Sequence, residues 1–412
     1  MAFRFSISLK QILSLVFLTL TASLLADEPV NSLKVYGYVR NDFYFNSRLN
    51  QESIDGLFFL YPKPVSLNAA NADINAVPQA EMLSVNSRIG IDLTGSSILG
   101  AYSSAKIETD FAGFSSSYFV MRLRQAYMKL NWKKTELLLG QTWHPLFGNV
   151  IPTVLECDAG APFQPNNRSP QIRVTHNLNA SLSLIGAAAY EMQYLSQGPL
   201  GASACYMKNA MIPDLFLGSE INTTHWVSGV GLDFKTIKPS VEEISSLSAT
   251  IYAQYTENNF ILKAKSYWGE NLTDQQMLSG YGVSSINALS GAAGYTNFNI
   301  VSSWLNAVYG KTWQIGIFLG FSQNLGTNKT LMANADGKYT AYGNGYNNDS
   351  QLLLDQLYRI SPNVNYNLQN FKVGVEYNFT TANYGTLQSN GRVANPYSVN
   401  NHRVESTVSY FF

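Results

Sequence analysis

The chain has little charge, few cysteines and few histidines. Charged residues make up 13% of its 412 residues, and its 27 basic side chains are matched by 27 acidic ones. Nucleic-acid-binding domains are usually strongly basic, so we expect no nucleic-acid partner. The sequence also lacks the GxSxG, HExxH and glycine-rich phosphate-loop motifs. It therefore carries no signature of an enzyme, a metal site or a cofactor.

Neither the histidines nor the carboxylates of the loops predict a catalytic or metal site from the sequence alone. The four histidines are His144, His176, His225 and His402. A serine–histidine–aspartate set or a metal site would need distant segments to converge, and no local motif predicts this. Asp349 and Asp355 lie in a polar stretch with oxygen ligands suited to calcium, but single carboxylates in loops are mostly solvated. We predict no catalytic residue, no metal and no cofactor.

Only two cysteines are present, Cys157 and Cys205. In an exported chain, the oxidising compartment permits a disulfide between them. Both lie in segments that we interpret as loops, which makes a bridge feasible. We therefore predict a Cys157–Cys205 disulfide, with two separate free thiols as the alternative.

Long apolar runs are missing beyond the N-terminus, which excludes a helical membrane protein. At the N-terminus, Arg4 and Lys10 precede an apolar stretch, residues 12–25, that is shorter than a spanning helix. A small residue then offers a cleavage site, an order typical of a secretory signal. We predict a signal peptide over residues 1–26 and a mature, slightly acidic domain over residues 27–412.

Aromatic residues in an alternating pattern are abundant. The chain has 25 tyrosines and 22 phenylalanines, yet its mean hydropathy is only −0.07. Near the C-terminus, Val408, Tyr410 and Phe412 fall on one face of a predicted strand. The opposite face carries Arg403 and Glu405. One apolar and one polar face are what a strand needs when it separates lipid from a wet lumen.

About sixteen such stretches follow one another, separated by alternating short turns and long polar connections. The long connections span residues 46–79, 144–168, 195–213, 270–296 and 326–355. Short turns at one end and long loops at the other are typical of bacterial outer-membrane barrels, and an even strand number closes the sheet without an edge. We predict an all-β, transmembrane antiparallel β-barrel with long extracellular loops. Where Pro362 interrupts a strand, we expect a bulge or an unpaired acceptor.

The polar faces of these strands carry charged side chains that we assign to the pore lining. The assigned residues are Arg40, Asp42, Arg88, Lys106, Glu108, Asp110, Arg122, Arg124, Arg173, Lys263, Lys265 and Arg359. Further candidates are Asp92, Asp233, Glu376, Arg403 and Glu405. The basic candidates outnumber the acidic ones, which predicts a weak preference for anions, because rings of charge set pore selectivity. The alternative is a network of ion pairs that only keeps the wall solvated. In the strand with Arg122 and Arg124, strict alternation places both arginines inward and Tyr127 outward.

Three stretches resemble the DcaP-like trimeric porins: GYVRND from residue 37, RLRQAYMKL from residue 122 and LLLGQTWHPLF from residue 137. The chain is also similar to porin-like outer-membrane proteins of Bacteroidetes type. The resemblance implies a sixteen-stranded barrel, a homotrimer, and a loop after the fifth strand that folds inward and narrows the pore. In this chain that loop is residues 144–168, and its only basic residue is Arg168. The resemblance also implies small carboxylates among the solutes.

The C-terminal pattern of Val408, Tyr410 and Phe412 resembles the assembly signal of outer-membrane barrels, which implies recognition by the barrel assembly machinery. We predict a porin of the bacterial outer membrane through which small polar solutes diffuse passively. Its expected partners are the lipid bilayer, lipopolysaccharide and further copies of the chain. One alternative is a surface receptor or adhesin whose loops bind a partner. Another is an outer-membrane hydrolase.

Overall fold

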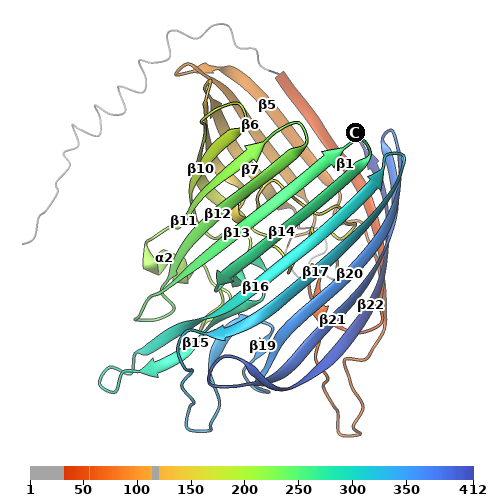
Figure 1. Ribbon diagram of the computed structural model, residues 1–412. Helices are drawn as coiled ribbons and strands as arrows, with labels where there is room; N and C mark the ends of the chain where they lie inside the picture. Colours follow the sequence, from red (N-terminus) through yellow and green to blue (C-terminus); the bar gives the residue numbers. More distant parts are fainter. Residues whose placement is uncertain (1–31, 55, 114–119) are drawn as a thin grey trace, which may run out of the picture.

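The computed structural model describes residues 32–54, 56–113 and 120–412, which form a closed barrel (Figure 1). Sixteen antiparallel strands pair in sequence order, and the last strand returns to the first. The predicted barrel is therefore confirmed, while the predicted signal peptide, residues 1–26, lies outside the described residues. Among those residues, no helix has the length and apolar character needed to cross a membrane.

The wall is built from strands that follow one another around the ring. They are β1 (Ser32–Asn46), β5 (Arg88–Ile98), β6 (Ala101–Asp110), β7 (Arg122–Asn131), β8 (Thr135–Trp143), β9 (Arg168–Asn177), β10 (Leu182–Ala189), β11 (Asp214–Asn222), β12 (Trp226–Ile237), β13 (Ile244–Glu257), β14 (Phe260–Glu270), β16 (Ala293–Gly310), β17 (Trp313–Thr327), β20 (Leu352–Leu368), β21 (Phe371–Leu387) and β22 (Val393–Phe411). A short strand, β4 (Gln79–Leu83), continues β5 along their common neighbour β1.

Smaller elements occur in the long connections. They are β2 (Asn50–Ser53), β3 (Phe58–Pro62), β15 (Ser279–Ile286), β18 (Ala341–Asn344), β19 (Tyr346–Asn347), helix α2 (Cys205–Ala210) and two 3₁₀ turns at Pro145–Phe147 and Thr273–Gln275. The strands β15 and β18 pair with each other, and β15 also extends the barrel sheet along β16. The connections at the opposite end of the barrel are tight turns, as the alternating loop lengths predict.

Side chains alternate between an apolar outer face and a polar inner face. On β22, Val404, Val408 and Tyr410 are 40%, 41% and 54% exposed, whereas Arg403 and Glu405 are fully buried. The outward positions of β1, β11, β12 and β17 are likewise mostly exposed valine, leucine, isoleucine or phenylalanine. A soluble protein rarely leaves so continuous an apolar surface open to water. A lipid bilayer covers such a surface, so the exterior is that of a membrane-spanning barrel.

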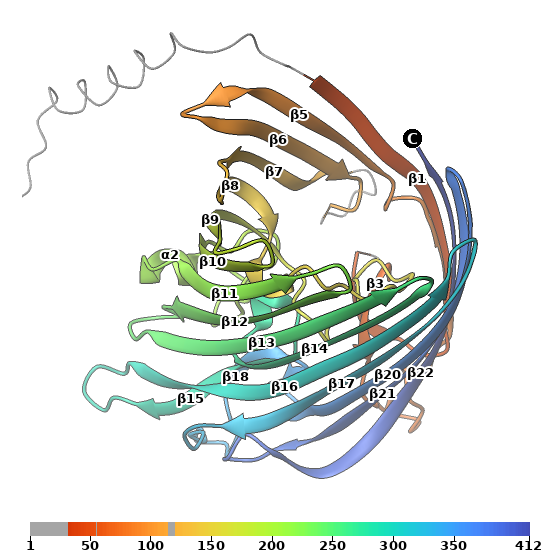
Figure 2. The same cartoon turned by 45° about the horizontal axis from the view of Figure 1, so that its top comes forward.

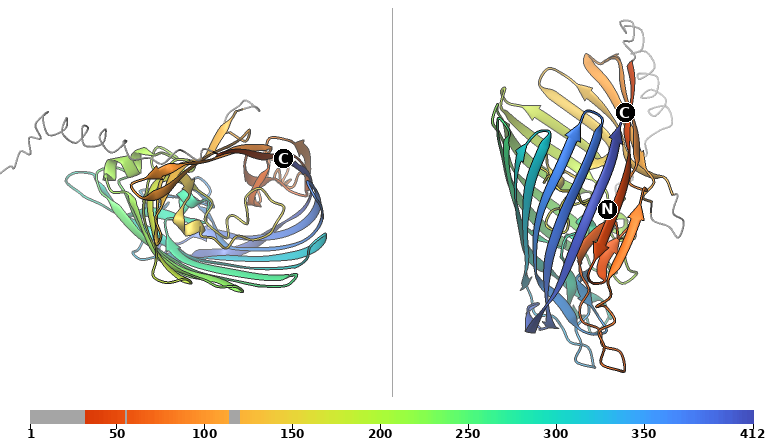
Figure 3. Two further views of the ribbon diagram at one scale, coloured as in Figure 1. Left: turned by 90° about the horizontal axis from the view of Figure 1, so that it is seen from above. Right: turned by 90° about the vertical axis from the view of Figure 1, so that its right-hand side faces the viewer.

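Two long connections fold into the barrel (Figure 2). One follows β8, the fifth strand of the wall, and its Leu146, Val150 and Phe163 are buried against inward-facing side chains. The other is the β2–β3 hairpin, in which every residue of Phe58–Pro62 is buried. Seen from above, both lie within the ring of strands (Figure 3). The inward loop after the fifth strand is thus confirmed. The inward hairpin was missed, because its short apolar run sits inside a polar connection.

A β-bulge in β7 changes the predicted facing of one residue. The register between β6 and β7 shifts after Glu108, so that both Arg124 and Gln125 reach the Glu108 carboxylate. Tyr127 consequently faces inward, opposite Lys106, and the prediction that it faces outward is wrong. Strict alternation cannot anticipate an extra residue in one strand of a pair.

Pro362 does not create a bulge. β20 and β21 keep one register on both sides of it, from Ile360 to Asn363. Between these two residues the β20–β21 ladder is interrupted, and Pro362 retains a partner only in β17. Proline has no N–H to donate, so the acceptor opposite it stays outside the ladder, which is one of the two predicted outcomes.

The ring closes where the C-terminal residue meets the first strand. Phe412 and Gly37 exchange two backbone hydrogen bonds of 3.1 Å. A Cβ atom at Gly37 would come within 2.7 Å of the Phe412 ring and 2.3 Å of the Arg88 carbonyl oxygen. Gly37 therefore provides the space that the terminal aromatic side chain fills.

Because every strand of the wall has a neighbour on both sides, the folded barrel should resist dodecyl sulfate until it is boiled. We expect the unboiled protein to migrate differently from the boiled protein on a denaturing gel. Identical mobility of the two samples would contradict a closed barrel.

Deleting Phe412 removes two backbone hydrogen bonds and the ring packed on Gly37. We expect the truncated chain to be exported normally but to reach the outer membrane at a lower level, measured by immunoblotting of membrane fractions. Gly37→Ala should lower that level as well, whereas Gly186→Ala, with open space around its Cβ, should not. Normal levels of the truncated chain would refute a role for this seam in assembly.

Candidate functional site

The predicted pore-lining side chains all project into the barrel, but they form two groups. The first, which we name the charged wall, consists of Arg40, Asp42, Arg88, Lys106, Glu108, Asp110, Arg122 and Arg124 on β1, β5, β6 and β7. The second, which we name the loop anchors, consists of Arg173, Lys263, Lys265 and Arg359. In the charged wall, Arg88 and Lys106 keep 21% and 24% of their side-chain surface exposed. The charged wall therefore borders water.

Two carboxylates organise the centre of the charged wall. Asp110 accepts two hydrogen bonds from Arg122, at 2.9 and 2.6 Å, and a third from Arg124 at 2.7 Å. Glu108 accepts a hydrogen bond of 2.9 Å from Arg124 and lies 3.6 Å from Arg88. Bidentate, charge-assisted bonds of this kind hold guanidinium groups in fixed orientations. The ion pairs anticipated by the alternative interpretation are thus present.

A further arginine joins these groups from the end of the inward loop. Arg168 begins β9, stacks with its guanidinium carbon 3.9 Å from the centroid of the Trp143 ring, and donates a 2.6 Å hydrogen bond to Gln193. Within the described parts of the chain, no carboxylate forms an ion pair with Arg168. The sequence indicated only that Arg168 belongs to the loop, because the folding of that loop determines which wall it reaches.

Arginines outnumber carboxylates at this place. We name Arg88, Arg122, Arg124 and Arg168 the arginine cluster. The other three arginines all act electrostatically on Arg168. The ion pairs of the cluster go to Glu108 and Asp110 alone, so positive charge is in excess. In the described residues, the Nε atoms of Arg88 and Arg168 and one terminal nitrogen of Arg122 are buried and have no acceptor. The positive charge of the cluster therefore comes mainly from buried guanidinium groups, and Arg88 is its partly exposed member.

Arg40 connects the charged wall to the inward loop. Its guanidinium lies 2.5 Å from a carboxylate oxygen of Asp42 and 3.4 Å from one of Glu405. It also donates a 2.7 Å hydrogen bond to the Leu155 carbonyl oxygen in the loop. The inward loop is therefore fixed on the β1 side by a side chain that is itself held by two carboxylates.

The loop anchors share one action, because each donates to a main-chain carbonyl in or next to the inward loop. Lys263 bonds the Ile151 carbonyl at 2.8 Å, and Lys265 bonds the Phe147 carbonyl at 2.5 Å. Arg173 bonds the Trp143 carbonyl at 2.6 Å. Aromatic rings surround the Lys265 ammonium at 5.1 to 5.9 Å, and the side chain is buried beneath the loop. These charges therefore position the loop.

Arg359 holds both inward segments at once. It pairs with Glu156 at 2.8 Å in the loop and donates to the Phe59 and Leu60 carbonyls of the hairpin at 3.2 and 2.8 Å. Burial raises the pKa of Glu156, and burial together with the neighbouring Glu156 carboxyl raises the pKa of Asp158, against the opposing effect of Arg359. Arg359 is thus the point at which two loops and the wall meet.

The predicted disulfide is wrong, because both cysteines are free. Cys157 is packed in the inward loop near Leu57 and Tyr44. Cys205 begins helix α2, accepts a hydrogen bond from Ser203 and packs with a different cluster beside β12. The two connections fold to different places, one into the lumen and one along the rim, which separates the thiols.

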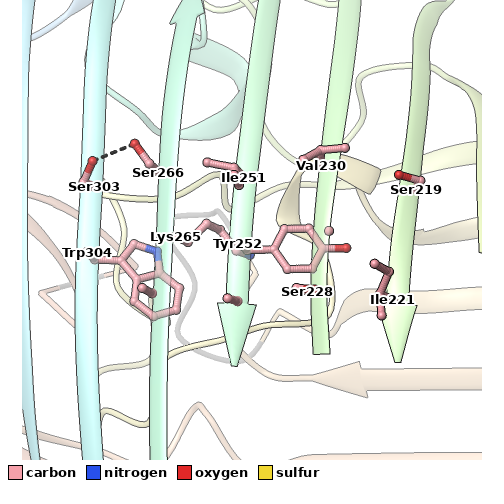
Figure 4. Close-up of a pocket in the computed structure, with 13 residues that line it drawn as sticks. Ser219, Ile221, Ser228, Val230, Ile251, Tyr252, Lys265, Ser266, Ser303 and Trp304 are labelled. Atoms are coloured by element: carbon pink, nitrogen blue, oxygen red, sulfur yellow. Dashed lines mark hydrogen bonds between the residues drawn. The ribbon is translucent and has the colours of Figure 1, made fainter. Parts of the chain in front are cut away.

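Two larger cavities open in different directions. One, of about 550 Å³, crosses β11 to β16 and is bordered by Ile221, Val230 and Ile251, which are 45%, 50% and 59% exposed on the outer face (Figure 4). It therefore opens toward lipid. The other, of about 590 Å³, lies between long loops and is lined by polar groups that include Lys63 and Asp349.

The combination of a sixteen-stranded ring, an apolar exterior, a charged interior and an inward loop after the fifth strand defines the porin fold. Comparisons with solved structures agree. No family model and no curated protein sequence matches the chain. The structure is similar to the outer membrane channel DcaP of Acinetobacter baumannii, with a TM-score of 0.69, 16% identity, and 93% and 97% of the two chains covered.

Two further porin structures are similar at lower scores. The anion-selective porin from Comamonas acidovorans aligns with a TM-score of 0.55 and 11% identity over 93% of this chain and 100% of the other. The trimer form of OmpT from Vibrio cholerae aligns with a TM-score of 0.53 and 9% identity over 93% and 99%. The resemblance found in the sequence is thus matched by similarity in structure, and at these identities the similarity concerns the fold.

Lys265→Met should loosen the inward loop. The substitution removes a charge-assisted hydrogen bond to the Phe147 carbonyl without leaving a carboxylate unpaired, and we expect the docking of the loop to weaken by roughly 1–2 kcal/mol. Limited proteolysis should then cut within residues 144–167 faster than in the original protein. Lys311→Met, in an exposed short turn, is the matched control. Equal cleavage rates would contradict the role of Lys265 as an anchor.

Proposed function

We propose that this protein is a porin of the bacterial outer membrane through which small hydrophilic solutes diffuse passively, with a weak preference for anions such as small carboxylates. The observation that carries the proposal is the arginine cluster, where positive charge exceeds negative charge beside the inward loop. A fixed positive potential raises the local concentration of anions, and rings of charge set the selectivity of pores.

A solute would enter from the hollow between the long loops and pass the charged wall. There an oxyanion would meet the partly exposed side chains of Arg88 and Lys106. The buried Arg122, Arg124 and Arg168 would add positive potential behind them, while Glu108 and Asp110 reduce the net attraction. Conduction needs binding that is favourable enough for entry and weak enough for release. Because Glu108 and Asp110 already pair with the guanidinium groups, an anion would be released readily, which favours permeation over tight binding.

The setting follows from the same architecture. The apolar exterior supports contact with the bilayer and lipopolysaccharide, and the terminal Phe412 supports recognition by the barrel assembly machinery. The trimer form of OmpT, which has a similar fold, supports assembly of this chain as a homotrimer. Cross-linking in detergent extracts tests that assembly, since a trimer yields a ladder of three bands.

Neither alternative function is favoured by a specific contact. For a receptor or adhesin, long loops would present surface to a partner, yet two of them are anchored inside the barrel. For a hydrolase, a histidine ring would need a serine hydroxyl. Within the described residues, the histidine rings instead contact Leu146 N, Thr135, Thr256 O and Tyr377.

Arg168→Gln tests the proposed selectivity, because it removes a positive charge without leaving a carboxylate unpaired. At about 4–6 Å in water a unit charge contributes on the order of 1 kcal/mol, so the anion-to-cation permeability ratio should fall about three- to fivefold. The zero-current potential in a salt gradient across a planar bilayer measures this ratio.

Lys329→Gln, in an exposed loop, carries the same change of charge and should leave the ratio unchanged. The proposal fails if Arg168→Gln and the original protein give the same zero-current potential. In that case the arginines would serve the wall structure only.

A further inference from the structure

Three side chains from distant segments converge at the long-loop end of the barrel. They are His144, Asp214 and Asp233, and one possible ligand atom from each lies within 4.8 Å of the other two. All three residues are almost completely buried, at 2%, 4% and 3% exposure. Sequence analysis predicted no metal site, because these residues are separated by many positions and form no motif.

The fold brings them together in a defined way. His144 is the first residue after β8, where the inward loop begins, and Asp214 is the first residue of β11. Asp233 lies on β12 opposite Phe216, so that both aspartates project from the same side of neighbouring strands. The site therefore joins the start of the inward loop to two strands of the wall.

The polar atoms at this place are not satisfied by the protein. In the described residues, one carboxylate oxygen of Asp214, one of Asp233 and the His144 Nε2 atom have no hydrogen-bond partner. The Nε2 atom faces Asp214 at 3.3 Å. Buried polar groups are usually hydrogen-bonded, and unpaired buried carboxylates are costly, so these atoms need a cation or protons.

A basic side chain close in the sequence does not supply that charge. Lys235, two positions beyond Asp233, pairs closely with Asp274 and donates to the Asn271 carbonyl oxygen at 2.5 Å. Another buried carboxylate nearby, that of Glu191, is bonded by Ser196. Among the described residues, further carboxylates thus lie close to the cluster, and no lysine or arginine forms an ion pair with Asp214 or Asp233.

We propose that His144, Asp214 and Asp233 bind a divalent transition-metal ion of the zinc type. One imidazole nitrogen and two carboxylate oxygens suit Zn²⁺, whereas Ca²⁺ and Mg²⁺ prefer oxygen alone. Three protein ligands leave one position for water. The bound ion clips the beginning of the inward loop to β11 and β12. This place is next to the other end of the loop, because Trp143 pairs with Arg168 and the His144 N–H bonds the Asn167 carbonyl at 3.0 Å.

Metal binding requires a change in which ring nitrogen of His144 carries the proton. Nδ1 accepts a 3.3 Å hydrogen bond from the Leu146 N–H, which places the ring proton on Nε2 in the metal-free protein. Coordination through Nε2 moves that proton to Nδ1 and gives up a contact at the long end of the hydrogen-bond range. The imidazole thus stays neutral, and any proton carried by the two aspartates is released when the metal binds.

Zinc titration of the untagged mature protein, stripped with a chelator, tests the site. We expect one Zn²⁺ bound per chain by calorimetry, and at least about tenfold weaker binding in Asp233→Asn and in His144→Gln. His402→Gln, which alters an exposed histidine paired with Tyr377, should bind as the original protein does. Heat-modifiable gel mobility verifies that each variant has folded.

X-ray absorption on the zinc-loaded original protein gives a second answer that does not depend on the variants. Nitrogen and oxygen neighbours at about 2.0–2.1 Å, without sulfur, are expected. A sulfur neighbour would assign the metal to Cys157 or Cys205 and overturn the proposal. Absence of stoichiometric binding, or equally tight binding by Asp233→Asn, would overturn it as well. None of these outcomes depends on whether the barrel conducts anions.

Discussion

Lipid offers no hydrogen bonds to a peptide backbone, so every strand of a membrane-spanning sheet must have a neighbour on each side. In this chain the requirement is met by closing sixteen strands into a ring, with Phe412 bonded to Gly37 at the seam. The remaining features follow from that closure. It creates an exterior that must be apolar, an interior that can carry charge, and a volume that loops can enter.

The interior is occupied by chain as well as by water. The inward loop and the β2–β3 hairpin bring backbone carbonyls into a polar space, and Lys263, Lys265 and Arg359 satisfy these carbonyls with charged donors. Such donors form stronger hydrogen bonds than neutral groups do. Inward-facing charges therefore have two roles in one barrel, since some hold the loops and others face the lumen.

In the charged wall, side chains are held in fixed orientations and positive charges outnumber negative charges. Asp110 and Glu108 fix the planes of Arg122 and Arg124, and the β7 bulge gives Arg124 access to both carboxylates. Arg168 then adds positive charge from the end of the inward loop, where it pairs with Trp143 and stacks on its ring. The ion pairs therefore leave a net positive charge in this part of the barrel, because Arg88, Arg122, Arg124 and Arg168 outnumber Glu108 and Asp110.

Alternation of apolar and polar residues determined the class of fold, the approximate number of strands, and the facing of residues such as Arg40 and Val408, because a strand has a period of two that sequence displays directly. It also indicated the long connection after the fifth strand. Tertiary structure alone decided which inward charges meet water, since the paths of the loops depend on contacts between distant residues. The inward loop thereby covered Lys265 and brought the equally buried Arg168 to the arginine cluster, in which Arg88 keeps contact with water. The paths of the loops also separated Cys157 from Cys205 and brought His144 to Asp214 and Asp233. Side chains from distant segments meet only when the ring has closed, so no local sequence pattern predicts these contacts.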